Sequence, residues 1–172
     1  MAVKHLHSVG VDPQPSGYGS EGWGLDSDWV IFQRLNREAD TVSGEAARNL
    51  RTDALRLVRG CPFDGVLADS YEWVDEEHLR TTMTIAVAKC AQRLGDDLFE
   101  AGDLLGAESA ASSGLRGAPD DFGLWDLGAR AIDARGDRTA LNRWLADASR
   151  HLDPAEMERI RAGLTHHDPS ET

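Results

Sequence analysis

The sequence predicts an all-α protein in which antiparallel helix pairs stack on one another. Three observations support this fold class. From residue 28 onward, apolar residues recur at intervals of three and four, which is the spacing of a helix face. No segment shows the sustained apolar–polar alternation of a half-buried strand. The pair Gly102-Asp103 recurs as Gly136-Asp137, 34 positions later, which indicates a repeated helix pair.

The first helix is expected to begin at Asp28, where the apolar period starts. Ser27 or Asp28 is the expected N-cap, because a short side-chain oxygen accepts a hydrogen bond from a free backbone N–H there. Its inner face comprises Trp29, Phe32, Leu35 and Ala39. A second helix is expected over residues 44–59, with an inner face of Ala47, Leu50, Ala54, Leu57 and Val58.

The segment 59–75 breaks the helical pattern with two glycines and a proline, and is rich in apolar residues. Its aromatic residues have two interpretations. They either pack across a helix groove or anchor a partner protein. The candidate partner-contact residues are therefore Phe63, Tyr71 and Trp73.

A long helix is expected over 76–100, followed by helices over 103–116, 121–135 and 138–151. The inner face of the long helix comprises Leu79, Met83, Ala86, Val87, Cys90, Leu94 and Leu98. A last helix is expected over 154–164, with Met157, Ile160 and Leu164 facing inward. Its start signal is strong, since Asp153 is the N-cap, Pro154 the first helical residue and Glu156 the capping-box partner.

The 34-residue interval is the period of tetratricopeptide-type helix pairs, so we expect a short right-handed superhelix. Gly102 and Gly136 fall at the turns between paired helices, where a left-handed backbone is expected. Gly117 lies in a connection that is expected to have more room. The spacing places Trp125 and Trp144 in the core of the repeats.

The chain is expected to comprise three parts. Residues 1–27 are rich in glycine, serine and proline and predict an extended or flexible arm. Residues 28–164 form the helical domain, and residues 165–172 are expected to be a disordered tail.

Composition bounds the function and the cellular compartment. The net charge of −12 and the pI of about 4.8 disfavour direct nucleic-acid binding, because phosphate is repelled. Cys61 and Cys90 stand far apart without a CxxC motif, which indicates a reducing, cytoplasmic compartment. No run of apolar residues is long enough for a membrane span.

No catalytic motif is recognised, so an enzyme is not expected, and no catalytic residue or cofactor is assigned. The glycine spacing from Gly17 to Gly22 follows no strand and does not indicate a dinucleotide loop. The run from Asp75 to His78 contains metal-ligand residue types, but such acids also suit a solvated first helical turn. We therefore assign no metal site.

The order of several segments resembles the bacterial transcriptional activator domain of actinobacterial antibiotic regulatory proteins and related LysM- or membrane-linked proteins. The segments that carry this resemblance are Ala54-Leu-Arg-Leu-Val-Arg-Gly-Cys-Pro-Phe63, then Trp73, then Leu98-Phe-Glu-Ala-Gly-Asp103. The resemblance covers about residues 25–164. It implies a tetratricopeptide-like helical module beside a winged-helix DNA-binding domain, and that second domain is not part of this sequence.

The sequence and the resemblance together lead to a non-enzymatic protein–protein interaction module of a transcription-regulator-like protein. Its helical groove is expected to bind a partner helix, a peptide or a second copy of the chain. The alternative is a small-molecule effector-sensing module that uses the same groove.

Overall fold

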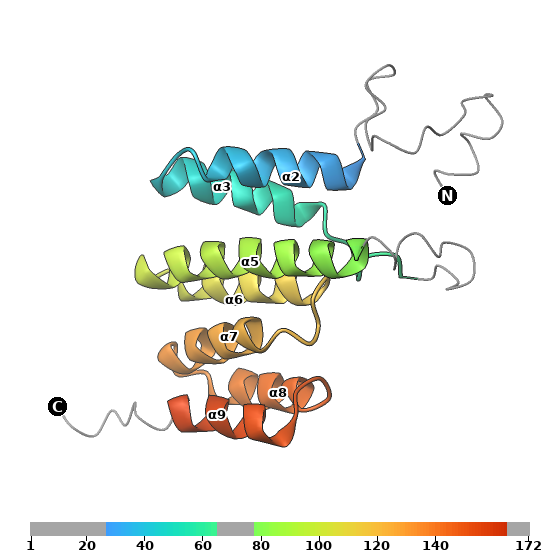
Figure 1. The fold of residues 1–172 in the computed structure, drawn as a ribbon. Helices are drawn as coiled ribbons and strands as arrows, with labels where there is room; N and C mark the ends of the chain where they lie inside the picture. The colour runs from blue at the N-terminus through green and yellow to red at the C-terminus, as the bar shows by residue number, and fades with distance from the viewer. Residues whose placement is uncertain (1–26, 65–77, 165–172) are drawn as a thin grey trace, which may run out of the picture.

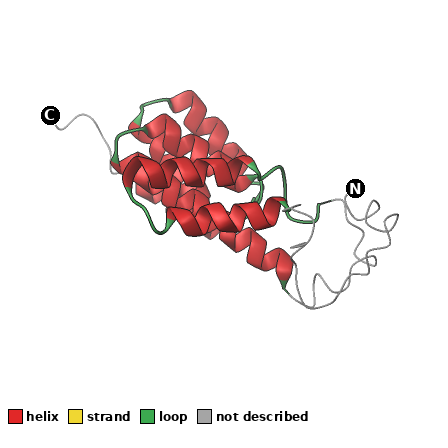
Figure 2. Cartoon of the chain, turned by 90° about the horizontal axis from the view of Figure 1, so that it is seen from above, coloured by secondary structure: helices red, strands yellow, loops and turns green. Residues whose placement is uncertain are grey.

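The computed structural model describes residues 27–64 and 78–164 (Figure 1). Within these ranges the chain forms seven α-helices and no strand (Figure 2), which confirms the all-α prediction for this part. Most of the expected N-terminal arm and all of the expected tail 165–172 lie outside the described residues. The helices are α2 (Asp28–Ala39), α3 (Gly44–Arg56), α5 (Leu79–Glu100), α6 (Leu104–Leu115), α7 (Phe122–Ala134), α8 (Arg138–Ala148) and α9 (Pro154–Leu164).

Within the described residues, most helices that follow one another in the chain pack as neighbours. Helix α2 packs on α3, α5 on α6, and α7 on α8. Helix α6 also packs on α7, α3 on α5, and α9 on α7, so each pair contacts the next. Figure 1 shows the resulting stack, which runs from α2 and α3 at one end to α8 and α9 at the other.

Short polar side chains fix where the helices begin. The backbone N–H of Val30 donates to Oγ of Ser27 at 3.3 Å, so Ser27 is the N-cap of α2. At the start of α9, Glu156 N–H donates to Asp153 Oδ1 at 2.8 Å and Asp153 N–H donates to Glu156 Oε2 at 3.1 Å. This reciprocal pair is the predicted capping box. Equivalent aspartate caps begin α6, α7 and α8 at Asp103, Asp121 and Asp137.

Glycines in the left-handed region form the turns before α6 and α8. Gly102 has a φ of 79° and Gly136 a φ of 77°, and a Cβ at either site would meet nothing within 4 Å. Backbone conformation rather than space therefore requires glycine here. The prediction that the chain has more room at Gly117 is wrong. This glycine is buried, and a Cβ added there would lie 2.9 Å from Val58 Cγ1.

Three helix boundaries differ by three residues from those expected. Helix α3 ends at Arg56, three residues early, and the N–H of Val58 turns back to the carbonyl of Leu55. Helix α5 begins at Leu79 because His78 has a φ of 50°, which a right-handed helix does not allow. Helix α8 ends at Ala148, whose carbonyl accepts from the N–H groups of His151 and Leu152 in a tight turn.

The core forms two clusters of buried side chains that meet at Leu115. Helices approach closely where the sequence has small residues. A Cβ on Gly114 would lie 2.5 Å from Ala91 Cβ of α5 and 2.7 Å from Leu124 Cδ1 of α7. The first cluster includes Phe32, Leu55, Val87, Cys90, Leu94 and Leu124, and the second includes Trp125, Ile132, Leu141, Met157 and Ile160.

A buried arginine ties the first helix pair to α5. Arg51 is 7% exposed and donates to Asp40 Oδ1 and to Asp97 Oδ2, both at 3.2 Å. Arg93 of α5 donates to the same Asp40 oxygen at 2.7 Å. Burial alone would raise the pKa of Asp40, but the hydrogen bonds and charges of Arg93 and Arg51 outweigh it and lower that pKa below its ordinary 3.8.

The lowered pKa of Asp40 predicts a pH-dependent contribution to stability. A carboxylate whose folded pKa is depressed stabilises the fold above its unfolded pKa, and this contribution disappears as pH falls through the folded pKa. Asp40→Asn should therefore be less stable than the parent at pH 7, and the gap should narrow below about pH 4. The gap is the difference between the urea unfolding midpoints of the parent and Asp40→Asn, measured once at pH 7 and once below about pH 4. Asp53→Asn is the charge-matched control, because it removes an exposed ion pair with Arg56. A stability difference between the parent and Asp40→Asn that widens in acid would refute the prediction.

Candidate functional site

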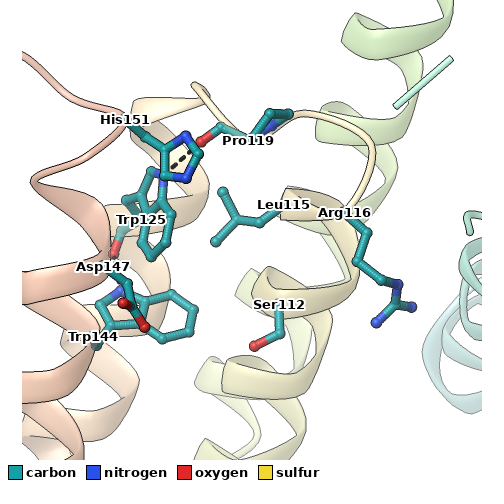
Figure 3. Close-up of a pocket in the computed structure, with 8 residues that line it drawn as sticks. All are labelled: Ser112, Leu115, Arg116, Pro119, Trp125, Trp144, Asp147 and His151. Carbon is teal, nitrogen blue, oxygen red and sulfur yellow. Dashed lines mark hydrogen bonds between the residues drawn. The ribbon is translucent and has the colours of Figure 1, made fainter. Parts of the chain in front are cut away.

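An open groove of about 290 Å³ lies where α6, α7 and α8 meet (Figure 3). The loop between α6 and α7 and the turn after α8 complete its walls. Aromatic and apolar side chains form the floor, and polar side chains stand around it. The lining residues are Ser112, Leu115, Arg116, Pro119, Trp125, Trp144, Asp147 and His151.

Two tryptophans form the floor in a fixed arrangement. The ring centroids of Trp125 and Trp144 lie 5.0 Å apart with a 65° angle between the planes, an edge-to-face contact. Trp125 Nε1 donates to the carbonyl of Pro119 at 2.7 Å, and Trp144 Nε1 donates to the carbonyl of Trp125 at 2.9 Å. Both indole N–H groups are thus satisfied inside the protein, so the floor offers ring surface rather than donors.

The Trp144 ring cannot move deeper into the protein, because the backbone of α7 lies against it. Gly128 of α7 lies directly behind it, and a Cβ at that position would collide with the ring. Trp144 is therefore half-buried, with its inner side against backbone. A rigid aromatic surface of this kind loses little conformational entropy when a ligand covers it.

His151 covers one end of the floor. Its ring stacks on Trp125 with centroids 5.7 Å apart and 23° between the planes. Its Nδ1 lies 3.1 Å from Asp120 Oδ1, which joins the turn after α8 to the loop before α7. Trp125 is only 6% exposed as a result, so it supports the groove from below.

The walls of the groove carry two charged side chains. On the α6 side, Arg116 Nε donates to the carbonyl of Val58 at 3.2 Å, and its guanidinium points away from the two indoles (Figure 3). On the α8 side, Asp147 pairs with Arg150 at 3.0 Å. Arg150 is exposed and the Asp147 side chain is about half exposed, and solvent-facing ion pairs of this kind contribute little to stability. Asp147 is thus available to a ligand.

Of the partner-contact residues predicted from the sequence, the structure describes Phe63 alone, and Phe63 does not line this groove. Phe63 is half-buried with a φ of 61°, and the Arg80 guanidinium lies 5.9 Å from its ring centroid. Tyr71 and Trp73 lie outside the described residues. The role of these three residues stays a prediction.

Features that would indicate other chemistry have structural explanations or lie outside the described ranges. Burial raises the pKa of the Cys90 thiol to about 12, so this thiol stays protonated in the core. Among residues 27–64 and 78–164, no three histidine, cysteine or acidic side chains gather in a metal-binding arrangement. The acids before His78 lie outside these ranges. None of the described helices is long and apolar enough to span a membrane.

Part of this site is predictable from the sequence. The repeat spacing predicts Trp125 and Trp144 in the core, and the packing of both rings in the second core cluster confirms this. That spacing does not single out Asp147 or His151 as functional. The three-residue spacing between Trp144 and Asp147 was the available signal, because residues i and i+3 share a helix face.

Comparison with protein-family models, with curated proteins and with solved structures finds no match to this chain. The resemblance to the bacterial transcriptional activator domain therefore stays a prediction.

Proposed function

We propose that the chain is a non-enzymatic protein–protein interaction module that binds a linear peptide of a partner in the groove over Trp125 and Trp144. The observation that carries this proposal is the aromatic floor, whose rings are held by internal hydrogen bonds and by the backbone at Gly128. Rigid tryptophans in a depression are the side chains that most often dominate binding energy at protein interfaces.

The repeat geometry supports a tetratricopeptide-like stack. Gly102 and Gly136, one repeat apart, share nearly the same positive φ, and each precedes an aspartate that caps the next helix. Stacked helix pairs of this type present long grooves to extended or helical segments. The family resemblance implies a regulatory role in a transcription-regulator-like protein, and the two separated cysteines favour the cytoplasm. Both expectations are part of the same proposal.

A peptide suits the groove better than a small effector does. Small-molecule sites are enclosed and direct several polar groups at the ligand. Here the groove is open, both indole N–H groups are occupied, and Arg116 is tied to Val58. An open aromatic floor accommodates side chains from a longer segment.

A displayed library of random peptides tests this function. We expect wild-type protein to enrich peptides that lose binding when Ser112→Phe fills the groove. Ser109→Phe, one turn earlier on α6 and not in the lining, is the matched control and should retain binding. No enrichment, or equal binding to both variants, would contradict a peptide groove at this position.

A further inference from the structure

The charge around the groove restricts the partner. The chain carries a net charge of −12, so its long-range field attracts cationic segments and repels acidic ones. Within the groove, the charged group on the same helix face as Trp144 is the carboxylate of Asp147, whose side chain is 46% exposed. The overall field and the local charge therefore favour the same kind of ligand.

Asp147 and Trp144 form a combination that suits a cation. A guanidinium or ammonium gains from the face of an indole ring and from a nearby carboxylate at the same time. The existing partner of Asp147 is Arg150 in an exposed i,i+3 pair at 3.0 Å, which an incoming cation can replace at small cost.

The described residues on the α6 side of the groove place no positive charge beside Trp144 and Asp147. Arg116 is held by its Nε–H to Val58, and its guanidinium is directed away from the indoles (Figure 3). The acid Asp120 already has His151 as a partner at 3.1 Å. The α6 side of the groove is left with Leu115 as an apolar contact beside the tryptophans.

We propose that the groove selects a basic linear peptide. An arginine or lysine lies between the Asp147 carboxylate and the Trp144 indole, and an adjacent apolar side chain contacts Leu115 and the tryptophan floor. This inference rests on the proposed peptide-binding function and adds the chemical class of the partner.

Three fluorescein-labelled nine-residue peptides in a glycine–serine background test the proposal by fluorescence anisotropy. The first carries two arginine–leucine pairs, the second replaces both arginines by glutamate, and the third replaces both leucines by serine. We expect the first to bind most tightly, the second not to bind, and the third to bind weakly. Added salt should weaken binding of the first probe.

Variants locate the charge that matters. Asp147→Asn should weaken binding of the arginine–leucine probe roughly fivefold or more, as expected for the loss of a charge pair at an interface. Asp53→Asn is the matched control, because Asp53 forms a similar exposed i,i+3 pair with Arg56 on α3 and lies outside the lining. It removes the same net charge and should change affinity less than about twofold.

Equal losses in the two variants would overturn the specific role of Asp147. Binding of the glutamate probe, if Ser112→Phe abolishes it, would overturn the basic preference and leave the peptide groove intact. Absence of binding by the arginine–leucine probe would also overturn this inference, and the library selection would then decide the proposed function independently.

Discussion

Trp125→Ala is expected to lower the free energy of unfolding by about 3–5 kcal/mol, as for other buried aromatic side chains. Trp125 is 6% exposed, bonds the carbonyl of Pro119 and contacts Trp144 edge to face. Alanine would leave a cavity in the second core cluster, an unpaired carbonyl, and no ring for His151 to stack on. Urea unfolding followed by circular dichroism at 222 nm measures the loss.

Trp125→Phe is the control for this substitution. It retains most of the ring packing and loses the hydrogen bond to Pro119, so it should cost clearly less than alanine. An unfolding midpoint for Trp125→Ala equal to that of the parent would mean that the indole is not part of the core.

Gly114→Ala is expected to destabilise the fold by about 1–3 kcal/mol through overpacking. The added methyl group would lie 2.5 Å from Ala91 Cβ, a short side chain that cannot rotate away, so α5 and α6 must separate. This cost outweighs the roughly 1 kcal/mol that alanine normally gains over glycine in a helix.

Gly163→Ala supplies the opposite control. Gly163 lies in α9, and a Cβ there would meet nothing within 4 Å, so alanine should leave stability unchanged or raise it by up to about 1 kcal/mol. In thermal or urea melts, the unfolding midpoint of Gly114→Ala should fall below that of the parent, and the midpoint of Gly163→Ala should equal or exceed it. A stabilising Gly114→Ala would show that the two helices do not approach as closely as described.

The turns and caps were predictable because their causes are local. A glycine followed by an aspartate specifies a left-handed turn and the next N-cap within two residues, as at Gly136 and Asp137. The capping box of Asp153 and Glu156 is equally local. These signals placed the helix pairs in order without any knowledge of tertiary contacts.

Helix ends were less predictable because competing bonds decide them. The apolar pattern extended the helix at 138–151 to its full length, but Ser149 Oγ donates to the carbonyl of Ala146 at 2.8 Å and the chain turns. Because α8 ends early, the chain turns and the His151 ring stacks on Trp125, which helps to form the groove. Nothing in the local spacing specifies that contact.

The buried Arg51 shows a second limit. It lies one helical turn after Ala47 on the inner face of α3. A charged residue is not part of the apolar pattern that predicts an inner face, so its burial is not expected from the sequence. Its burial depends on Asp40 and Asp97, which come from distant parts of the chain. The groove likewise required three helices to be placed relative to one another before its lining was visible.

The proposed groove is tested most directly by the indole N–H signals in a ¹H–¹⁵N NMR spectrum during addition of a library-selected peptide. The signals of Trp125 and Trp144 should shift, because both rings line the groove. Trp29, which stacks on Phe32 in α2 at the other end of the stack, should not shift (Figure 1). A peptide that shifts the Trp29 signal and leaves those of Trp125 and Trp144 unchanged would contradict binding in this groove.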